Sequence, residues 1–284
     1  MDIENKNQLK LIGIDLDGTL LSRRKKVTTK VINALLKLRQ KSPELVIAII
    51  TGRFSRSAQR IIKTLNNSGV DVNYLCSSNG SVVYSVKNEE YQKLYELNIP
   101  SKNARVIFEY CLKNKICFQG YLANCNNEKN IVISNNTIIG TTINLFNKKH
   151  SFCSDLFVDN EYHKINLLAF SKKALSKLKQ YLYDHYGNEL ELANIYSTFS
   201  EVTAKNVNKA HALEYICKLE NIDLEHTAVV GDSLNDYPMF EIAKYKFAMK
   251  KANEKLKQIS TYIASSKRSN QFSEIIDQTI SLID

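Results

Sequence analysis

Two pairs of aspartates, each placed directly after an apolar run, are the residues most capable of chemistry in this sequence. Asp15 and Asp17 follow LIGI and precede Gly18, and Asp232 and Asp236 lie in GDSLND after TAVV. Four carboxylates in one crevice would repel each other strongly unless a cation lay among them, and oxygen ligands suit Mg²⁺. We therefore expect a divalent metal site. Gly18 would permit the sharp turn that lets both Asp15 and Asp17 face it.

A threonine and a lysine occur at comparable places. Thr51 directly follows LVIAII, and Lys209 lies in VNKAHAL. A hydrogen-bond donor and a positive charge beside the metal would make the pocket accept a dianionic phosphoryl group, and an aspartate carboxylate could then attack phosphorus to give an aspartyl phosphate. Arg53, close to Thr51 in the TGR stretch, is interpreted as structural rather than catalytic.

Alternating apolar and amphipathic segments at both ends of the chain must position these residues. Strands are expected at LIGI, LVIAII, VNYLCSS, TAVVGD, YKFAM and TYIAS. Helices are expected after Thr28-Thr29 and over RFSRSAQRIIKTLNN, NKAHALEYICKLENI, LNDYPMFEIA and ANEKLKQIS. Continuous apolar strands joined by helices favour a doubly wound α/β fold, a Rossmann-like parallel sheet covered on both faces. Its ligand site should lie beyond the carboxyl ends of the strands.

The middle of the chain has a different composition, which is richer in Asn, Tyr and Lys. Strand-like runs at ICFQGYL, NIVIS and KINLLAF accompany a helix-like run at ALSKLKQYLYDHY. We predict an inserted α+β domain at residues 86–190, a cap that sets substrate specificity, and a catalytic core made of residues 1–85 and 191–284.

Composition narrows the class of protein. The chain has 284 residues, is 44% hydrophobic and carries a formal charge of +10. Its lysines are scattered, without an arginine-rich run or an aromatic RNA-binding signature, so nucleic acid is not an expected partner. No apolar run is long enough to cross a membrane, and the six cysteines form no CxxC pair, which favours a cytoplasmic protein with reduced thiols.

Taken together, DLDGTL, ITGR, the lysine before a helix and GDSLND resemble the haloacid dehalogenase superfamily of aspartate-nucleophile phosphatases. The large insertion and SSNG at residues 77–80 are similar to the Cof-type branch of that superfamily. The resemblance implies an Mg²⁺-dependent phosphatase that hydrolyses small phosphate esters, sugar phosphates or similar metabolites. A monomer or weak homodimer is expected.

The resemblance also implies a role for each motif residue. Asp15 would be the nucleophile and a metal ligand. Asp17 would be the general acid and then the general base, with its backbone carbonyl on the metal. Thr51 and Lys209 would hold the phosphoryl oxygens.

On the same basis, Asp232 would bind Mg²⁺ directly, and Asp236 would hold a metal-bound water or orient Lys209. The implied substrate-binding residues are Gly52, Asn79, Gly80 and Asn235.

The sequence departs from the family at three places. Ala210 follows the lysine where glycine is usual, Lys250-Lys251 replace a common Gly-Asn pair, and SNQFSEII replaces the usual Asp-Gly-Val near the end. None of these changes removes a catalytic group.

Two alternatives stay open. A phosphotransferase or phosphomutase on the same fold would pass the phosphoryl group to a sugar hydroxyl, although GDSLND lacks the longer glycine-containing insertion of such mutases. A non-catalytic protein that binds nucleic acid or a protein partner through its basic surface is the second alternative.

Overall fold

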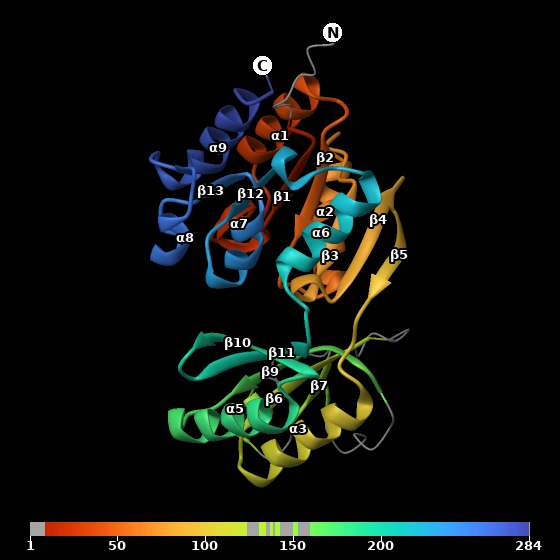
Figure 1. The fold of residues 1–284 in the computed structure, drawn as a ribbon, viewed down its shortest axis with the longest axis vertical. Helices are drawn as coiled ribbons and strands as arrows, with labels where there is room; N and C mark the ends of the chain where they lie inside the picture. Colours follow the sequence, from red (N-terminus) through yellow and green to blue (C-terminus); the bar gives the residue numbers. More distant parts are fainter. Residues whose placement is uncertain are drawn as a thin grey trace. The chain divides into compact units, whose positions relative to one another are not determined.

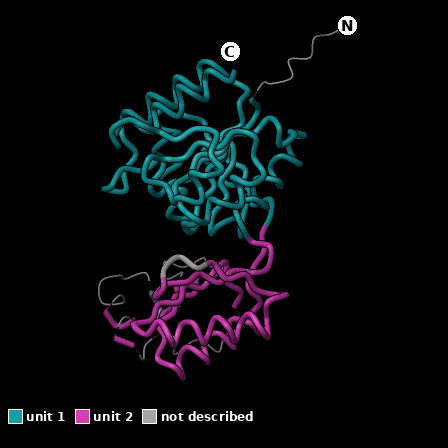
Figure 2. Tube along the Cα trace, turned by 60° about the vertical axis from the view of Figure 1, so that its left-hand side comes forward, with its two compact units in different colours: residues 1–95, 208–284 teal, residues 96–207 magenta. Residues whose placement is uncertain are grey.

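The computed structural model describes residues 9–123, 131–134, 137, 138, 140–142, 150–152 and 160–283. The chain forms two compact units, which are drawn in separate colours in Figure 2. The first unit combines Met1–Tyr95 with Asn208–Asp284, and the second unit is Glu96–Val207.

An eight-stranded sheet forms the centre of the first unit (Figure 1). In spatial order its strands are β14 (Tyr262–Ile263), β13 (Tyr245–Ala248), β12 (Thr227–Gly231), β1 (Leu11–Ile14), β2 (Val46–Ile50), β3 (Tyr74–Ser77), β4 (Val82–Lys87) and β5 (Glu90–Glu96). The strands from β14 to β3 are parallel, and β4 is antiparallel to β3. The chain proceeds from β1 toward β3 and later returns to place β12 on the other side of β1. This reversal is the switch point at which doubly wound sheets bind their ligands.

Helices cover both faces of this sheet, as the continuous apolar strands require. One face packs against α1 (Thr29–Lys41), α2 (Ser55–Asn66) and α9 (Gln271–Ile280), and the other against α6 (Lys209–Glu220), α7 (Tyr237–Ile242) and α8 (Glu254–Gln258). Alternate residues of β1 serve the two cores: Ile12 and Ile14 face the first, and Leu11 the second. The predicted doubly wound core is confirmed.

The second unit contains a separate sheet with its own core. Its spatial order is β10 (Leu190–Tyr196), β11 (Phe199–Ala204), β9 (Tyr162–Leu168), β6 (Cys117–Leu122), β7 (Ile131–Ile133) and β8 (His150–Phe152). Helices α3 (Ser101–Lys113) and α5 (Lys172–Tyr186) pack on this sheet through residues such as Ile107, Leu178 and Ile165. The strands and the helix expected in this region are present, and α3, β8, β10 and β11 are additional.

The structure divides the chain at other positions than the predicted residues 86–190. Residues 86–95 belong to the first unit, because β4 and β5 extend its sheet as a hairpin. The hairpin turn is Asn88-Glu89, whose φ angles of 51° and 64° suit a two-residue connection. Residues 191–207 belong to the second unit, because β10 and β11 pair with each other and β11 pairs with β9.

Two composition-based expectations can be compared with the described residues. Cys76, Cys111, Cys117 and Cys217 are buried free thiols, whereas Cys125 and Cys153 lie outside the described residues. Among the helices in the described ranges, none combines the length and the apolar character needed to span a bilayer.

The buried parallel strands should dominate the stability of the first unit. Ile47 on β2 is fully buried, whereas Ile263 on the edge strand β14 is 41% exposed. We expect Ile47→Ala to lower the free energy of unfolding by about 2–5 kcal/mol, because it removes buried methyl groups and leaves a cavity. The measurement is urea unfolding followed by circular dichroism.

Ile263→Ala is the matched control and should cost less than about 1 kcal/mol. Equal losses for the two variants would contradict the packing described for this sheet.

Candidate active site

The ends of two neighbouring strands bring the first and last motifs together. Asp15 directly follows β1 and Asp232 directly follows β12, and these strands are parallel partners with Ile14 opposite Val230. The backbone N–H of Asp15 donates to the carbonyl of Val230 at 3.0 Å, which extends the pairing to the residue itself. Residues 217 positions apart in sequence therefore meet at the carboxyl edge of the sheet, as predicted from their positions after apolar runs.

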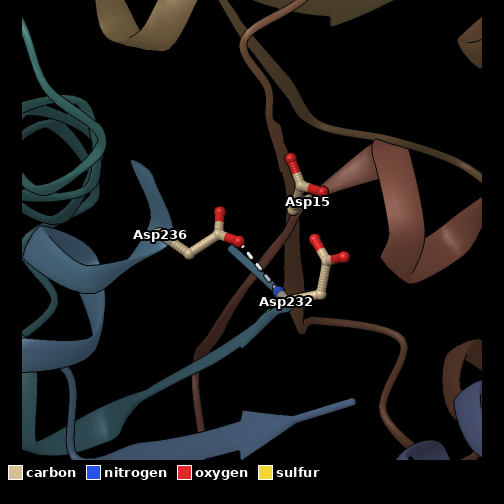
Figure 3. Close-up of side chains that lie close together, drawn as sticks. All are labelled: Asp15, Asp232 and Asp236. Carbon is tan, nitrogen blue, oxygen red and sulfur yellow. Dashed lines mark hydrogen bonds between the residues drawn. The ribbon is translucent and has the colours of Figure 1, made fainter. Parts of the chain in front are cut away.

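Three carboxylates converge at this edge (Figure 3). One oxygen from each of Asp15, Asp232 and Asp236 lies within 4.8 Å of the other two. Asp236 ends a single turn, Leu234–Asp236, and its Oδ2 accepts hydrogen bonds from the backbone N–H groups of Asp232 at 2.8 Å and Ser233 at 2.9 Å. The loop after β12 thus orients the Asp236 side chain through its own backbone.

Lys209 places a positive charge inside this cluster. Its ammonium is fully buried and lies 2.6 Å from Asp15 Oδ1 and 2.5 Å from Asp236 Oδ1. Lys209 is the first residue of α6, and the side chain of Asn208 caps that helix by accepting from the N–H of His211 at 2.9 Å. Ala210, in the place where the family usually has glycine, is accommodated within this regular helix start.

The charges of the cluster do not balance among the protein groups alone. Three carboxylates and one ammonium leave two negative charges when all are ionised. Burial raises the pKa of Asp15 to about 8, against the opposing effect of Lys209 and with a further rise from Asp236. Burial also raises the pKa of Asp232 to about 6, again with help from Asp236. For Lys209, burial lowers the pKa, but the two adjacent carboxylates outweigh it and keep the amine charged.

The cluster fits a hard divalent cation. All three side chains offer oxygen, the ligand type that Mg²⁺ prefers. Asp232 Oδ1 is buried and has no hydrogen-bond partner among the described residues, which is costly for a carboxylate oxygen unless a cation binds it. A dication would also cancel the two excess negative charges of the cluster.

The carboxylate of Asp17 lies outside this cluster. It accepts from Arg53 Nε at 2.5 Å and Nη2 at 2.8 Å, and from Lys25 Nζ at 2.6 Å. Partial burial raises its pKa, but the hydrogen bonds from Arg53 and Lys25 prevail and lower it to about 2. Of the four carboxylates expected in one crevice, three form the cluster, and the Asp17 carboxylate instead pairs with Arg53 and Lys25. The expected metal contact through the Asp17 backbone carbonyl is not tested by this cluster.

Gly18 makes the turn after Asp17 possible. Its φ of 88° lies in the left-handed region, and a Cβ atom there would lie 2.0 Å from Asp232 Oδ2. The close approach of the two motif loops therefore requires glycine at this position.

Thr51 and three of the predicted substrate-binding residues meet beside β2. Thr51 is buried, its Oγ1 accepts from the N–H of Arg53 at 3.1 Å, and its carbonyl accepts from the N–H of Asn79 at 3.0 Å. Asn79 Oδ1 in turn accepts from Asn235 Nδ2 at 3.1 Å, and a Cβ at Gly52 would lie 2.9 Å from the same oxygen. The structure thus gathers Thr51, Gly52, Asn79 and Asn235 from three separate segments.

The remaining predicted substrate-binding residue, Gly80, packs against the start of α6. A Cβ atom there would lie 2.5 Å from the carbonyl oxygen of Asn208. Glycine at position 80 therefore lets the turn after β3 pack closely against the start of the helix that carries Lys209. A contact between Gly80 and a ligand stays a prediction.

Two polar groups near the site were not singled out by sequence reasoning. Lys25 joins Arg53 on the Asp17 carboxylate, and the buried Thr19 Oγ1 has no hydrogen-bond partner among the described residues. Thr19 could have been noticed because it completes the DGT stretch. The pairing of Lys25 follows from a loop conformation that has no local sequence signal.

The second unit carries a polar surface that sequence reasoning also left unassigned. Along β9, Ile165 belongs to the apolar core, and Lys164 and Asn166 alternate with it. Lys164 Nζ lies 2.7 Å from Glu201 Oε1 on β11, and Asn166 Nδ2 donates to Tyr121 Oη at 3.3 Å. Asn166 Oδ1 is buried without a hydrogen-bond partner in the described part of the chain.

Comparison with known proteins gives consistent matches over nearly the whole chain. The sequence model of the haloacid dehalogenase-like hydrolase family matches residues 12–276. A Mycoplasma pneumoniae protein named "Putative phosphatase" is 33% identical over 94% of this chain and 96% of its own length. Phosphatase YwpJ of Bacillus subtilis is 27% identical over 89% of this chain and 93% of its own length.

A solved structure shows the same fold. The haloacid dehalogenase subclass IIB sugar phosphatase BT4131 has a TM-score of 0.76 at 20% identity, over 96% of this chain and 100% of its own. With the carboxylate cluster and Lys209 at the expected edge of the sheet, the chain belongs to the haloacid dehalogenase-like hydrolases and is a phosphoric monoester hydrolase.

Proposed function

We propose that this protein is an Mg²⁺-dependent phosphatase that hydrolyses small phosphorylated metabolites, sugar phosphates or similar, through an aspartyl-phosphate intermediate. The observation that carries the proposal is the buried Lys209 ammonium, shared between Asp15 and Asp236 within a cluster of three carboxylates. Nucleophile, phosphate-binding cation and metal ligands are then next to one another.

Asp15 is the proposed nucleophile. Lys209 holds its Oδ1, so Oδ2 is left to attack phosphorus. A bond forms between this oxygen and phosphorus as the bond from phosphorus to the leaving oxygen breaks. Lys209 and the Thr51 hydroxyl would stabilise the charge on the phosphoryl oxygens in the transition state.

Asp17 is the proposed general acid and base. It would donate a proton to the leaving oxygen and later accept one from the water that hydrolyses the aspartyl phosphate, which releases inorganic phosphate and restores Asp15. The ion pairs with Arg53 and Lys25 keep Asp17 ionised at neutral pH. The Asp17 carboxylate must therefore leave Arg53 before it can carry the proton.

The residues that would hold Mg²⁺ are Asp15, Asp232 and Asp236, together with the backbone carbonyl of Asp17. When bound, the ion would neutralise charge on the carboxylates and polarise the phosphoryl group. Asn79, Asn235, Gly52 and Gly80 would line the substrate side.

The second unit is proposed to act as the cap that sets specificity. Support comes from the polar groups on its sheet, Lys164, Asn166, Tyr121 and Glu201, which could hydrogen-bond hydroxyl groups of a substrate. The structural neighbour BT4131 is named a sugar phosphatase, which favours a sugar phosphate. Release of free phosphate, rather than transfer to a second sugar, would distinguish hydrolysis from phosphotransfer.

Replacement of the nucleophile tests the central assignment. We expect Asp15→Asn to lower kcat for p-nitrophenyl phosphate by about a thousandfold or more, because an amide cannot form the acyl phosphate. Steady-state kinetics in Mg²⁺ give the rate, and circular dichroism checks that the fold is intact.

The matched control is Asp71→Asn. Asp71 is exposed and lies in the loop before β3, at the amino end of the strands. Its activity should equal that of the wild type. An active Asp15→Asn enzyme would remove the nucleophile assignment.

Metal removal tests the carboxylate cluster independently of turnover. EDTA should abolish hydrolysis, and added Mg²⁺ should restore it. Because Mg²⁺ would bind only the folded site, we expect it to raise Tm in differential scanning fluorimetry, with a stabilisation of about 2.7 kcal/mol at 100 times Kd.

In Asp232→Asn the Mg²⁺-induced rise in Tm should be smaller, because a neutral amide replaces the carboxylate that would bind the ion. Asp71→Asn should show the same rise as the wild type. A Tm that does not respond to Mg²⁺ in the wild type would argue against the metal site.

A further inference from the structure

A strongly basic cavity lies on the first unit, beside the carboxylate cluster. It has a volume of about 280 Å³. We call it the basic pocket, and define it by the five cationic side chains that line it: Arg23, Lys250, Lys251, Lys267 and Arg268.

The position of the basic pocket links it to the reaction site. Gly18 and Asp232 also line the cavity, and these two residues belong to the loops after β1 and β12 that hold the carboxylates. The five cations come from three separate segments: the loop after β1, the loop after β13, and the segment before α9. Tertiary folding therefore concentrates cations that the sequence leaves dispersed.

The five cations have no carboxylate partner among the residues that the structure describes. All are exposed, and within the described ranges none of them forms an ion pair. Lys250 Nζ donates to the carbonyl of Ser265 at 2.6 Å, which fixes one ammonium at the rim. Like charges held this close repel one another, so the arrangement favours a bound polyanion.

The acidic groups close by do not neutralise the pocket. Among the described residues that line the pocket, Asp232 is the single carboxylate, and it belongs to the carboxylate cluster. Glu274, on α9, accepts from the N–H groups of Ser265 and Ser266 and from the hydroxyl of Tyr262. These hydrogen bonds use the Glu274 carboxylate within its own loop.

A larger cavity adjoins the basic pocket. It has a volume of about 710 Å³, shares Gly18, Arg23, Met249 and Arg268 with the pocket, and has apolar wall residues such as Leu20 and Phe272. This volume is within the usual range for small-molecule sites. The uncharged body of a metabolite therefore has room beside the cations.

We propose that the basic pocket binds a second phosphate group of the substrate, so that the preferred substrates are small molecules with two phosphate groups. One phosphate is hydrolysed at Asp15, and the other binds the five cations. Lys250-Lys251, which replace the usual Gly-Asn pair, are then specificity residues. This inference rests on the proposed function and narrows its substrate class.

The test compares matched substrates that differ by one phosphate. The pairs are glucose 6-phosphate with glucose 1,6-bisphosphate, fructose 6-phosphate with fructose 1,6-bisphosphate, and ribose 5-phosphate with ribose 1,5-bisphosphate. For each pair the ratio of kcat/KM, bisphosphate over monophosphate, is measured in Mg²⁺. We expect the wild type to prefer the bisphosphate in at least one pair.

Two double variants separate the pocket from general charge. K251Q/K267Q removes two cations of the basic pocket, and K10Q/K218Q removes two exposed lysines elsewhere on the same unit. We expect K251Q/K267Q to lower the ratio of kcat/KM, bisphosphate over monophosphate, by about fivefold or more, through a higher KM for the bisphosphate. The effect is moderate because each exposed charge contact contributes modestly. K10Q/K218Q should keep the preference and should hydrolyse p-nitrophenyl phosphate at the wild-type rate.

Three results would overturn the inference while the phosphatase activity stands. They are a wild type without bisphosphate preference in any pair, a preference that survives in K251Q/K267Q, and an equal loss in K10Q/K218Q. Salt-sensitive binding of a single-stranded oligonucleotide that is lost in K251Q/K267Q, without bisphosphate preference, would assign the pocket to nucleic acid instead.

If the proposed function itself is wrong, neither the wild type nor the two double variants will hydrolyse p-nitrophenyl phosphate. Isothermal titration calorimetry with the three bisphosphates would then still decide the role of the pocket. Weaker binding by K251Q/K267Q than by K10Q/K218Q supports it, and equal or undetectable binding overturns it.

Discussion

The buried ammonium of Lys209 is the interaction on which the rest of the site depends. It joins the end of β1, through Asp15, to the turn after β12, through Asp236, from the first residue of α6. A buried charge of this kind is tolerated only when its partners are close and well oriented, and removal of one partner leaves an expensive unpaired charge. The same ion pairs therefore orient Asp15, the proposed nucleophile, and hold three segments of the chain together.

The sheet topology makes this arrangement possible. Strands β2 and β3 are added on one side of β1 and β12 on the other, so that β1 and β12 are parallel neighbours whose carboxyl ends are adjacent. Backbone N–H groups after β12 then orient Asp236, and the glycine turn after Asp17 brings the first loop against Asp232. The resulting excess of negative charge is the physical reason that a divalent cation fits.

Positive charge on the first unit is distributed in two different ways. Arg53 and Lys25 are paired with Asp17, where they hold a carboxylate in its ionised form. The cations of the basic pocket have no such partner in the described ranges and surround a cavity. The first group lowers the pKa of a carboxylate, and the second surrounds a cavity in which we propose that an anion binds. Net charge alone could not separate these roles, because it counts both groups equally.

Much of the core and of the catalytic cluster followed from the sequence by itself. The apolar runs LIGI and TAVV predicted buried strands, and the aspartates after them predicted a shared site, because parallel strands end at a common edge. The family resemblance added an expected role for each motif residue.

Only the tertiary structure decided which neighbours each side chain has. Residues 86–95 extend the first sheet and residues 191–207 the second, since strand pairing depends on partners distant in sequence. In the same way, the Asp17 pair with Arg53 and the convergence of Arg23, Lys251 and Arg268 arise from loops that meet in space. Local periodicity reports burial along a segment, whereas charge pairing and strand order are set by long-range contacts that no single segment encodes.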